Sequence, residues 1–539
     1  MAARLKTVLL FVGSLLNKQS HAKEKEHVVA FKTAIALSAL ENNQLKQVEV
    51  GETKIVLVRQ GDSVHAYQAN CPHAGAPLEK GAICEGKLVC PWHKAVYDLE
   101  DGSLEQPPSL ESLKKYAVKI EYGQVMVEVD NPTQHTHLQA GEESDQIVIL
   151  GSGAAGSAAL SALEESGYHG RIVVIDQEKS APYDRTALTK FVPNGSMDVS
   201  EVPTLLEDNA FEQKNVQRIV STVTQIDSKQ KKLLLANQQH ISFKKLLIAT
   251  GGAPTRPDLP GVELSGIHVL RNLQQEKTLL CAVDQLKQLV IVGNSFIGME
   301  MAAALRKRGI DIKVIAPHPL PFEAQFGEEI ARYFRALHEQ NGVEFIDAEV
   351  AGFTGDRRVE AVELKDGSQV KTDVVLLATG VKPVTSFVHD LPLNEDGGLK
   401  VDEYLQAGQD IYAVGDIASF PLDGKPTRIE HWRVAQQQGR TAAKNMLGEQ
   451  EVYDRVPFFW TQQFGTRFEH LGHPQKWDNV DIIGSLEDQN FVALYGLKNH
   501  LVGVFATGRV RTTGKLLLEM QHDLTLKQAQ QLVNETQEG

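Results

Sequence analysis

The sequence predicts a multi-domain protein with an N-terminal all-β domain, two Rossmann-like α/β domains and a small α+β domain at the C-terminal end. Three observations lead to this prediction. Two short boxes, each with one Cys and one His, lie among short apolar strand patterns near the N-terminus. A strand–glycine–helix pattern occurs twice, about 140 residues apart. Antiparallel strand patterns and an amphipathic helix over 526–533 follow at the end.

Composition limits the class of protein. A chain of 539 residues is long enough for three or four domains. Its net charge of −14 argues against nucleic acid as a partner. The four Cys are too few for a disulfide scaffold, which suits a reducing compartment, mitochondrial or cytoplasmic.

Residues 1–27 are expected to be a leader or a disordered extension. The first 23 residues hold four Lys or Arg and no acidic residue, as in a mitochondrial address, while 20–22 resemble a signal cleavage site. The apolar run Val8–Leu16 is too short to cross a bilayer, and no other segment has that length. No transmembrane segment is therefore predicted.

The N-terminal β domain is expected over 28–131. Its apolar runs LKQVEV, KIVLVRQ, VHAYQA, KLVCPW, YAVKIEY and QVMVEVD are separated by Gly-containing turns. Residues 132–145 are polar, contain Pro and Gly, and show no periodicity, which predicts a linker.

The two boxes predict a metal centre. Cys71 and His73 form the first box, Cys90 and His93 the second, with sixteen residues between His73 and Cys90. A Rieske [2Fe–2S] cluster takes two Cys on one iron and two neutral His on the other. Zinc also accepts two Cys and two His, but zinc fingers pair like with like, whereas each pair here is mixed. The boxes therefore favour a Rieske centre.

Both boxes depart from those of high-potential respiratory Rieske proteins. Ala76 and Trp92 stand where that class has an additional Cys pair, and Ala95 replaces a Ser that donates to a cluster sulfur, although Tyr97 is kept. Since hydrogen bonds to the sulfurs raise the potential, we expect the low end of the Rieske range. Lys94 replaces the usual Gly, with no effect that the sequence reveals.

The first glycine pattern predicts a dinucleotide site. Gly151, Gly153 and Gly156 follow an apolar strand and open a helix, where they allow a tight turn, approach of a pyrophosphate and close helix–strand packing. Asp176 ends the next strand, 25 residues after Gly151, where it can accept hydrogen bonds from a ribose.

The second glycine pattern predicts a nicotinamide coenzyme site. Gly293 and Gly298 are present, but Ser295 takes the middle position. The next strand ends in Ala316, where an NAD-preferring site usually has an acid. His318 lies nearby, and there is no Arg to bind a 2′-phosphate. This absence mildly favours NADH as the coenzyme, although NADPH is not excluded.

A series of motifs gives a specific resemblance. These motifs are ILGSGAAG, PYDRTALTK, LLIATGGAP, IVGNSFIGMEMA, LLATGVKP, IYAVGDIA and HWRVAQQQGRTAA. Their order resembles that in ferredoxin reductases of oxygenase systems and in apoptosis-inducing factor. With the Rieske boxes ahead of them, the chain resembles the apoptosis-inducing-factor-like, Rieske-bearing flavoproteins. The resemblance implies FAD-binding parts over 146–272 and 393–449, an NAD(P)-binding domain over 273–392, and a C-terminal domain over 450–539.

The same resemblance implies further FAD contacts. Arg185 and Lys190 would lie by the pyrophosphate and the isoalloxazine, and Val223 would hold the adenine through its backbone. Asp416 would bind the ribityl and pyrophosphate region, and Trp432 would border the flavin.

Lys190 and Glu300 are the catalytic residues that the resemblance implies. A Lys near the flavin favours the anionic reduced state, and a carboxylate opposite it balances the charge and orients the nicotinamide. Residues 177–200 contain no Cys, so the dithiol route of related flavoproteins is absent, and the cluster becomes the expected electron acceptor.

The sequence thus predicts an oxidoreductase that passes hydride from NAD(P)H to FAD and single electrons to the [2Fe–2S] cluster. The edge formed by His73 and His93 is expected to be exposed and to lead to an acceptor, a protein or a quinone. One alternative is a redox-sensing signalling protein, acting in apoptosis without turnover; another is a reductase that serves a separate oxygenase. The oligomeric state is left open, with a homodimer as one option.

Overall fold

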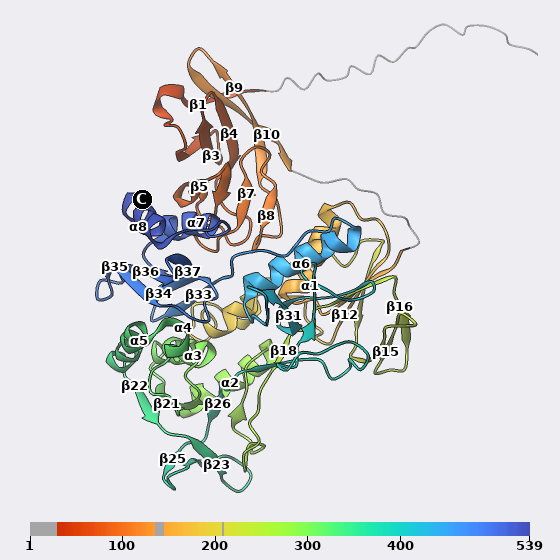
Figure 1. Ribbon diagram of the computed structural model, residues 1–539, viewed down its shortest axis with the longest axis vertical. Helices are drawn as coiled ribbons and strands as arrows, with labels where there is room; N and C mark the ends of the chain where they lie inside the picture. Colours follow the sequence, from red (N-terminus) through yellow and green to blue (C-terminus); the bar gives the residue numbers. More distant parts are fainter. Residues whose placement is uncertain (1–29, 135–144, 207–209, 539) are drawn as a thin grey trace, which may run out of the picture.

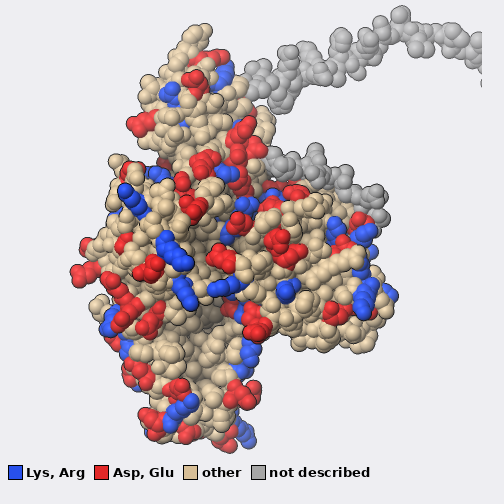
Figure 2. Space-filling model, in the orientation of Figure 1, with Lys and Arg blue, Asp and Glu red and all other residues tan. Residues whose placement is uncertain are grey.

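The computed structural model describes residues 30–134, 145–206 and 210–538. The N-terminal domain lies at one end of the molecule, against the C-terminal domain and the first α/β domain, and the second α/β domain lies at the opposite end (Figure 1). Acidic and basic side chains are interspersed over the face in Figure 2. Among the described residues, no helix has the length and apolar character needed to cross a membrane. The expected leader, 1–27, lies outside the described residues.

The N-terminal domain consists of two antiparallel sheets, as expected of an all-β domain. The larger sheet contains, in spatial order, β1 (Lys32–Ala36), β10 (Gln124–Gln134), β9 (Lys114–Glu121), β4 (Ser63–Gln68), β3 (Thr53–Gln60) and β2 (Leu45–Val50). The smaller sheet contains β5 (Ala82–Cys84), β6 (Lys87–Val89), β7 (Val96–Asp98) and β8 (Leu104–Gln106).

Two boundaries in this domain differ from the expectation. β10 continues to Gln134, because Thr133 and Gln134 still pair with Lys115 and Lys114 of β9. The expected linker, 132–145, thus begins inside a strand, and residues 135–144 lie outside the described part. β6 ends at Val89, so the run KLVCPW is only half strand, and Cys90 starts a loop.

Both metal boxes form tight loops with matching hydrogen bonds. The backbone N–H of Cys71 donates to Ala76 O at 2.8 Å, and that of Cys90 donates to Ala95 O at 2.8 Å. The fifth residue of each loop is left-handed: Gly75 at φ +75° and Lys94 at φ +60°. This backbone conformation suits Gly and costs a residue with a Cβ about 1 kcal/mol.

The first α/β domain is built on a mostly parallel six-stranded sheet. Its strands, in spatial order, are β13 (Val216–Val220), β12 (Ile172–Asp176), β11 (Ile147–Leu150), β17 (Lys245–Ile248), β30 (Ile411–Ala413) and β29 (Gln406–Gly408). Helix α1 (Ala154–Glu165) follows β11, and α6 (Trp432–Leu447) packs along it. The two helices can approach closely because Gly439 has no side chain. A Cβ at this position would lie only 2.2 Å from Ala155 O.

The second α/β domain repeats this topology, as the recurring glycine pattern predicts. Its parallel sheet contains, in spatial order, β22 (Val343–Asp347), β21 (Asp311–Ala316), β20 (Gln288–Val292), β26 (Val375–Leu377) and β19 (Ile267–His268). The helices are α2 (Leu273–Leu286), α3 (Phe296–Arg306), α4 (Glu323–Phe326) and α5 (Glu328–Gln340).

Smaller sheets complete and connect the two α/β domains. β18 (Gly252–Pro254) pairs with β27 (Val381–Pro383), at the two crossings between the domains. The other strands form three-stranded sheets: β14 (Val223–Asp227) with β15 (Lys232–Leu235) and β16 (His240–Ser242), β23 (Val350–Thr354) with β24 (Ala361–Leu364) and β25 (Gln369–Lys371), and β28 (Leu399–Lys400) with β31 (Ala418–Leu422) and β32 (Lys425–Thr427).

The C-terminal domain is an antiparallel sheet with two helices, as expected of an α+β unit. In spatial order it contains β33 (Phe458–Gln463), β34 (Thr466–Gly472), β37 (His500–Thr507), β36 (Asn490–Leu497) and β35 (Asn479–Ser485), followed along the chain by α7 (Val510–Glu519) and α8 (Leu526–Glu535). Its core is shared with the second α/β domain, since the rings of Phe326 and Phe505 stack at 4.1 Å.

Glu276 of α2 generates a stability prediction. The side chain is fully buried, and neither carboxyl oxygen has a hydrogen-bond partner among the described residues. Burial raises the pKa of Glu276 to about 8, so the native state favours the protonated carboxyl. Its contribution to stability is greatest below the unfolded-state pKa of about 4.3 and is lost as the pH rises toward 8.

We therefore expect Glu276→Gln to remove a pH dependence of about 4 kcal/mol in the free energy of unfolding between pH 4.5 and 8. Thermal unfolding across this range should show the variant more stable at pH 8 and close to the wild type at pH 4.5. Glu263→Gln, at an exposed position, is the matched control. A parallel pH profile for Glu276→Gln and wild type would contradict the prediction.

Candidate active site

One cavity of about 560 Å³ brings most of the expected site residues together. It runs from the glycine turn at Gly151 and Gly153 to the two imidazoles of the metal boxes, His73 and His93. Its wall comes from the first α/β domain, the start of α3, strand β33 and the N-terminal domain.

The glycine turn has the shape that a pyrophosphate requires. Gly151 is left-handed at φ +92°, and a Cβ there would lie 2.4 Å from Ala249 O. A Cβ on Gly156 would lie 1.9 Å from Gly151 O, so that helix α1 could not pack. A Cβ on Gly153 would meet no atom within 4 Å, so there is open space beside the helix N-terminus. This is where a dinucleotide phosphate fits.

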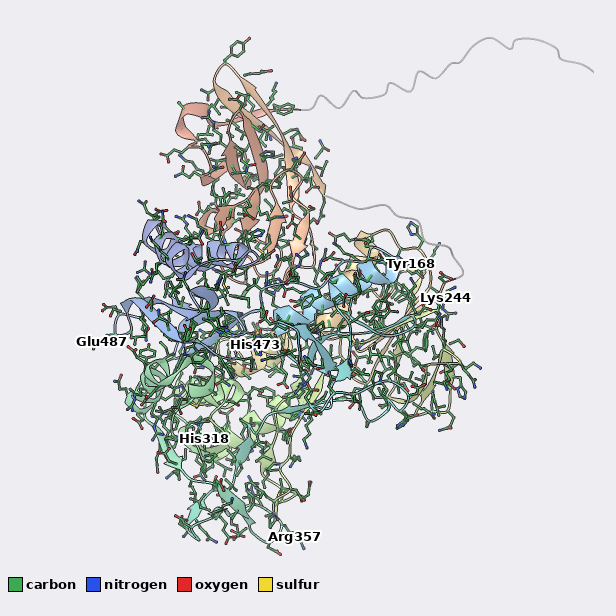
Figure 3. The ribbon with its side chains drawn as sticks, in the orientation of Figure 1. Tyr168, Lys244, His318, Arg357, His473 and Glu487 are labelled. Atoms are coloured by element: carbon green, nitrogen blue, oxygen red, sulfur yellow. The ribbon has the colours of Figure 1, made fainter. Side chains whose placement is uncertain are left out.

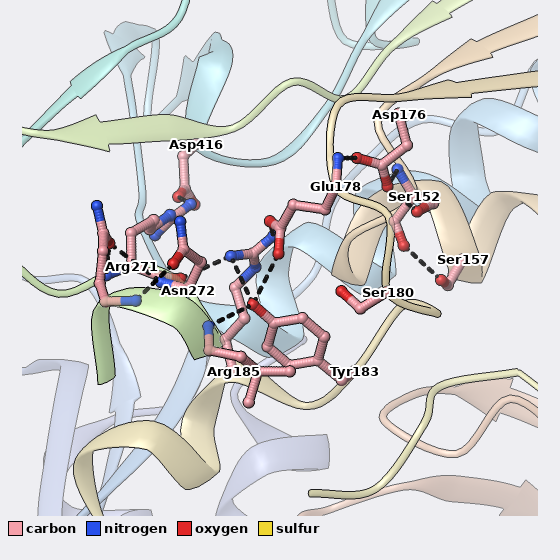
Figure 4. Close-up of polar contacts among 12 residues, drawn as sticks. Ser152, Ser157, Asp176, Glu178, Ser180, Tyr183, Arg185, Arg271, Asn272 and Asp416 are labelled. Carbon is pink, nitrogen blue, oxygen red and sulfur yellow. Dashed lines mark hydrogen bonds and ion pairs between the residues drawn. The ribbon is translucent and has the colours of Figure 1, made fainter. Parts of the chain in front are cut away.

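Asp176 ends β12 at the rim of the cavity, as the sequence predicts. Its carboxylate accepts hydrogen bonds from the Ser152 hydroxyl and from the Glu178 backbone N–H at 2.9 Å (Figure 4). These contacts hold the carboxylate beside the turn. A carboxylate accepts several hydrogen bonds, so Asp176 keeps capacity for a ribose.

Arg185 and Asp416 both line the cavity, and each is held by a partner that the sequence did not indicate. The Arg185 guanidinium pairs with Glu178 and donates to Arg271 O at 2.6 Å (Figure 4). Asp416 pairs with Arg271 at 2.7 Å. Arg271 therefore connects two residues that were expected to contact FAD. The sequence did not indicate this role, because Arg185 and Asp416 lie 86 and 145 residues away from Arg271.

Val223 and Trp432 also line the cavity. The Trp432 indole N–H and His431 Nδ1 are buried without a hydrogen-bond partner among the described residues. A buried donor left unpaired is costly, so a polar ligand in the cavity would complete these groups. The lining therefore fits FAD, with the phosphates at the glycine turn.

Lys190 and Glu300 lie 110 residues apart in the chain and form a buried ion pair at 2.9 Å. Glu300 also accepts a hydrogen bond from the Thr461 hydroxyl at 2.7 Å. The Lys190 ammonium lies 4.9 Å from the ring centre of Trp460, as in a cation–π contact. A cation fixed here stabilises negative charge that develops in the cavity.

The second glycine turn lies apart from this cavity. Gly293 and Gly298 do not line it, whereas Phe296 and Glu300 of α3 do. The Ser295 hydroxyl donates to Ala378 O at 3.3 Å, so it is directed back to the sheet. His318, labelled in Figure 3, lies in the second α/β domain, in the half of the molecule away from the N-terminal domain.

The four residues of the metal boxes form two pairs. The imidazole nitrogens His73 Nδ1 and His93 Nδ1 lie 3.1 Å apart. Cys71 and Cys90 are buried, and hydrogen bonding between them raises the pKa of the Cys71 thiol and lowers that of Cys90. The Tyr97 hydroxyl lies 3.1 Å from Cys71 Sγ.

This arrangement fits a two-iron cluster. Burial lowers the pKa of His73 and of His93, so both imidazoles are neutral, as metal ligands must be. The donors form one thiol pair and one imidazole pair, which is the ligand set that the two irons of a Rieske cluster take.

The histidine edge is not exposed, as we had expected it to be, because both imidazoles are partly buried. His73 and His93 line the same cavity as Lys190, and the His93 ring centre lies 5.4 Å from that of Trp460. The edge is directed inward because the N-terminal domain packs its boxes against β33 and α6. It therefore faces the cavity that Gly151 and Lys190 also line.

Comparison with protein families agrees with this geometry. Residues 31–117 match the Rieske [2Fe-2S] domain, and residues 145–439 match the pyridine nucleotide-disulphide oxidoreductase model, which spans more than half of the chain. The chain belongs to the pyridine nucleotide-disulphide oxidoreductase family. It is a Rieske-bearing member, so the predicted fold class is confirmed.

Several relatives of this oxidoreductase are known. Human "Apoptosis-inducing factor 3" is 31% identical over 86% of this chain and 80% of its own length. A Pseudomonas putida "Benzene 1,2-dioxygenase system ferredoxin--NAD(+) reductase subunit" is 31% identical over 61% of this chain and 81% of its own. A solved ferredoxin reductase for the CYP199A2 system from Rhodopseudomonas palustris has a TM-score of 0.68 at 28% identity, covering 72% of this chain and 97% of its own.

The oxidoreductase is therefore an NAD(P)H-dependent FAD enzyme with a [2Fe–2S] cluster, and electrons pass from NAD(P)H to FAD and on to the cluster. The alternative of a signalling protein without turnover is not favoured, because the chain combines both oxidoreductase domains and brings Lys190, Glu300 and the two imidazoles to one cavity.

The glycine turn provides a test that separates folding from binding. Gly156→Ala places a Cβ against Gly151 O and should lower the melting temperature of the flavin domain by several degrees. Gly153→Ala meets open space, so we expect a stable fold with at least tenfold weaker FAD binding. Calorimetry and FAD titration of the apoprotein measure both. Equal FAD affinity in Gly153→Ala and wild type would contradict the assignment.

Proposed function

We propose that this protein is a self-contained reductase in which the Rieske cluster receives electrons directly across the cavity that holds FAD. The observation that supports the proposal is the shared lining, since His73 and His93 lie on the same cavity as Gly151, Lys190 and Glu300. Electron transfer slows steeply with distance, so a common cavity favours transfer within one chain.

Cys71, Cys90, His73 and His93 would hold the cluster in this proposal. The Tyr97 hydroxyl is placed to donate to a ligand sulfur, while Ala95 has no hydroxyl to offer. The cluster would thus accept one hydrogen bond fewer than in the high-potential respiratory Rieske proteins. This supports a reduction potential at the low end of the Rieske range.

When bound, FAD accepts hydride and releases electrons singly, and the cluster takes them one at a time. The chain's own residues organise this chemistry. Lys190 holds a positive charge where electron density rises, and Glu300 fixes the ammonium in place. Phe296 and Glu300, at the start of α3, would position the nicotinamide against the flavin side of the cavity.

The dinucleotide residues divide between two sites. Gly151, Gly153, Gly156 and Asp176 would bind the FAD phosphates and ribose, with Arg185, Val223, Asp416 and Trp432 along the cofactor. Gly293 and Gly298 would bind the coenzyme phosphates outside the cavity, so that only the nicotinamide end enters it. Ala316 at the end of β21 offers no acid to select NADH.

The final acceptor in this proposal is a one-electron partner, a ferredoxin-type protein or a quinone. The four cysteines are free, which supports a reducing compartment such as the cytoplasm or the mitochondrial matrix. Anaerobic screening of such acceptors with reduced enzyme identifies the class that reoxidises the cluster.

Anaerobic mixing with NADH tests the proposal. We expect the flavin absorbance to bleach first and the EPR signal of the reduced cluster to appear afterwards, because the cluster lies downstream. Rapid-freeze EPR and stopped-flow absorbance follow the two events.

Cys90→Ser is the control variant. It removes one ligand, so flavin reduction should stay within about twofold of wild type while the Rieske EPR signal is lost. A bleached flavin next to a cluster that stays oxidised in the wild type would reject the relay.

A further inference from the structure

Lys94 occupies an unusual place in the second metal box. It is the fifth residue of its loop, where the first box has Gly75, and both are left-handed. Lys94 is completely buried, directly after the expected ligand His93. A long charged side chain in a strained, buried position is unfavourable unless its contacts compensate.

Those contacts cross from the N-terminal domain to the C-terminal domain. The Lys94 ammonium lies 3.0 Å from the Glu469 carboxylate of β34 and donates to Val510 O of α7 at 3.1 Å. A third hydrogen bond, to Pro91 O at 3.1 Å, ties the ammonium to its own loop. The three bonds satisfy all the donors of an ammonium group.

The partner carboxylate is itself fixed. Glu469 also accepts from Arg467 Nε at 3.1 Å and from the Thr513 hydroxyl. Arg467 lies over the Trp460 ring at 4.6 Å, beside the cavity. The Lys94 contact therefore joins the ligand loop to β34, which pairs with β33, the strand that forms one wall of the cavity.

The backbone of Lys94 is held from a second direction. Arg433 of α6 donates to Lys94 O at 2.9 Å, and also to Pro107 O at 2.8 Å. The second box is thus fastened to the C-terminal domain through the Lys94 side chain and to the first α/β domain through its carbonyl. The equivalent Gly75 has no side chain to make such a contact.

We propose that Lys94 is a positioning residue that fastens the Rieske domain to the flavoprotein, so that the histidine edge stays directed at the cavity. The domain is then a fixed internal acceptor and not a carrier that detaches to reach a partner. This inference deepens the proposed function and rests on it for the direction of electron flow.

Lys94→Gly tests the role without straining the loop, because Gly suits the left-handed backbone. Lys94→Arg is the conservative variant, and Glu469→Gln removes the partner charge. Tyr122→Gly is the matched control, since Tyr122 is a fully exposed, left-handed residue of the same domain. Iron content and the Rieske EPR spectrum show that each holoprotein has assembled its cluster.

The kinetic readout separates positioning from simple stability. In Lys94→Gly, flavin reduction by NADH should match wild type while cluster reduction slows at least about tenfold, since a buried ion pair across the domain contact is lost. Glu469→Gln should slow the same step, and Lys94→Arg should restore at least part of it. Cluster reduction at the wild-type rate in an assembled Lys94→Gly holoprotein would overturn the proposal.

A second readout does not depend on turnover. A protease site inserted within residues 135–144 of the holoprotein allows the chain to be cut between the two parts. After cleavage, the parts should stay together in wild type and Tyr122→Gly, and their dissociation constant should rise at least about tenfold in Lys94→Gly. Equal retention in all variants would overturn the fastening role. Retention that depends on Lys94 in a protein whose cluster is never reduced would uphold fastening and reject the proposed electron flow.

Discussion

The arrangement of this molecule depends on buried cations at the junction of its domains. The Arg433 guanidinium is buried at the start of α6 and donates to carbonyl and amide oxygens of the N-terminal domain, Pro107 O, Lys94 O and Gln106 Oε1. Arg440, two turns along the same helix, donates to Leu104 O at 3.3 Å and pairs with Glu165 of α1. Removing either cation would leave buried oxygens unsatisfied, so the N-terminal domain is held in one orientation.

In the proposed function, this fixed orientation keeps the two imidazoles beside the cavity that binds FAD. The ion pair of Lys190 and Glu300 lines the same cavity as His73 and His93. The Trp460 ring lies between these two groups, next to both Lys190 and His93. A separate reductase must meet its iron–sulfur partner by diffusion, whereas the proposed function places both redox sites in one packed molecule. The same packing turns the histidine edge toward the cavity and away from the outer surface.

The sequence was sufficient for the fold class because its signals are local. The paired boxes and the two strand–glycine–helix patterns each lie within about 25 residues, and they predicted the domain types correctly. Contacts between distant segments had no such signal. Arg271 was missed because Asp416 is 145 residues away, and the role of Lys94 depends on Glu469, 375 residues away. The inward direction of the histidine edge follows from domain packing, which no motif encodes.

The most direct test of the account is the dependence of cluster reduction on protein concentration. After anaerobic mixing with excess NADH, the rate constant for appearance of the Rieske EPR signal is measured over a hundredfold range of enzyme concentration. Transfer across a cavity inside one chain predicts a first-order rate constant that does not change over this range. A rate constant that rises in proportion to enzyme concentration would show transfer between molecules and contradict the account.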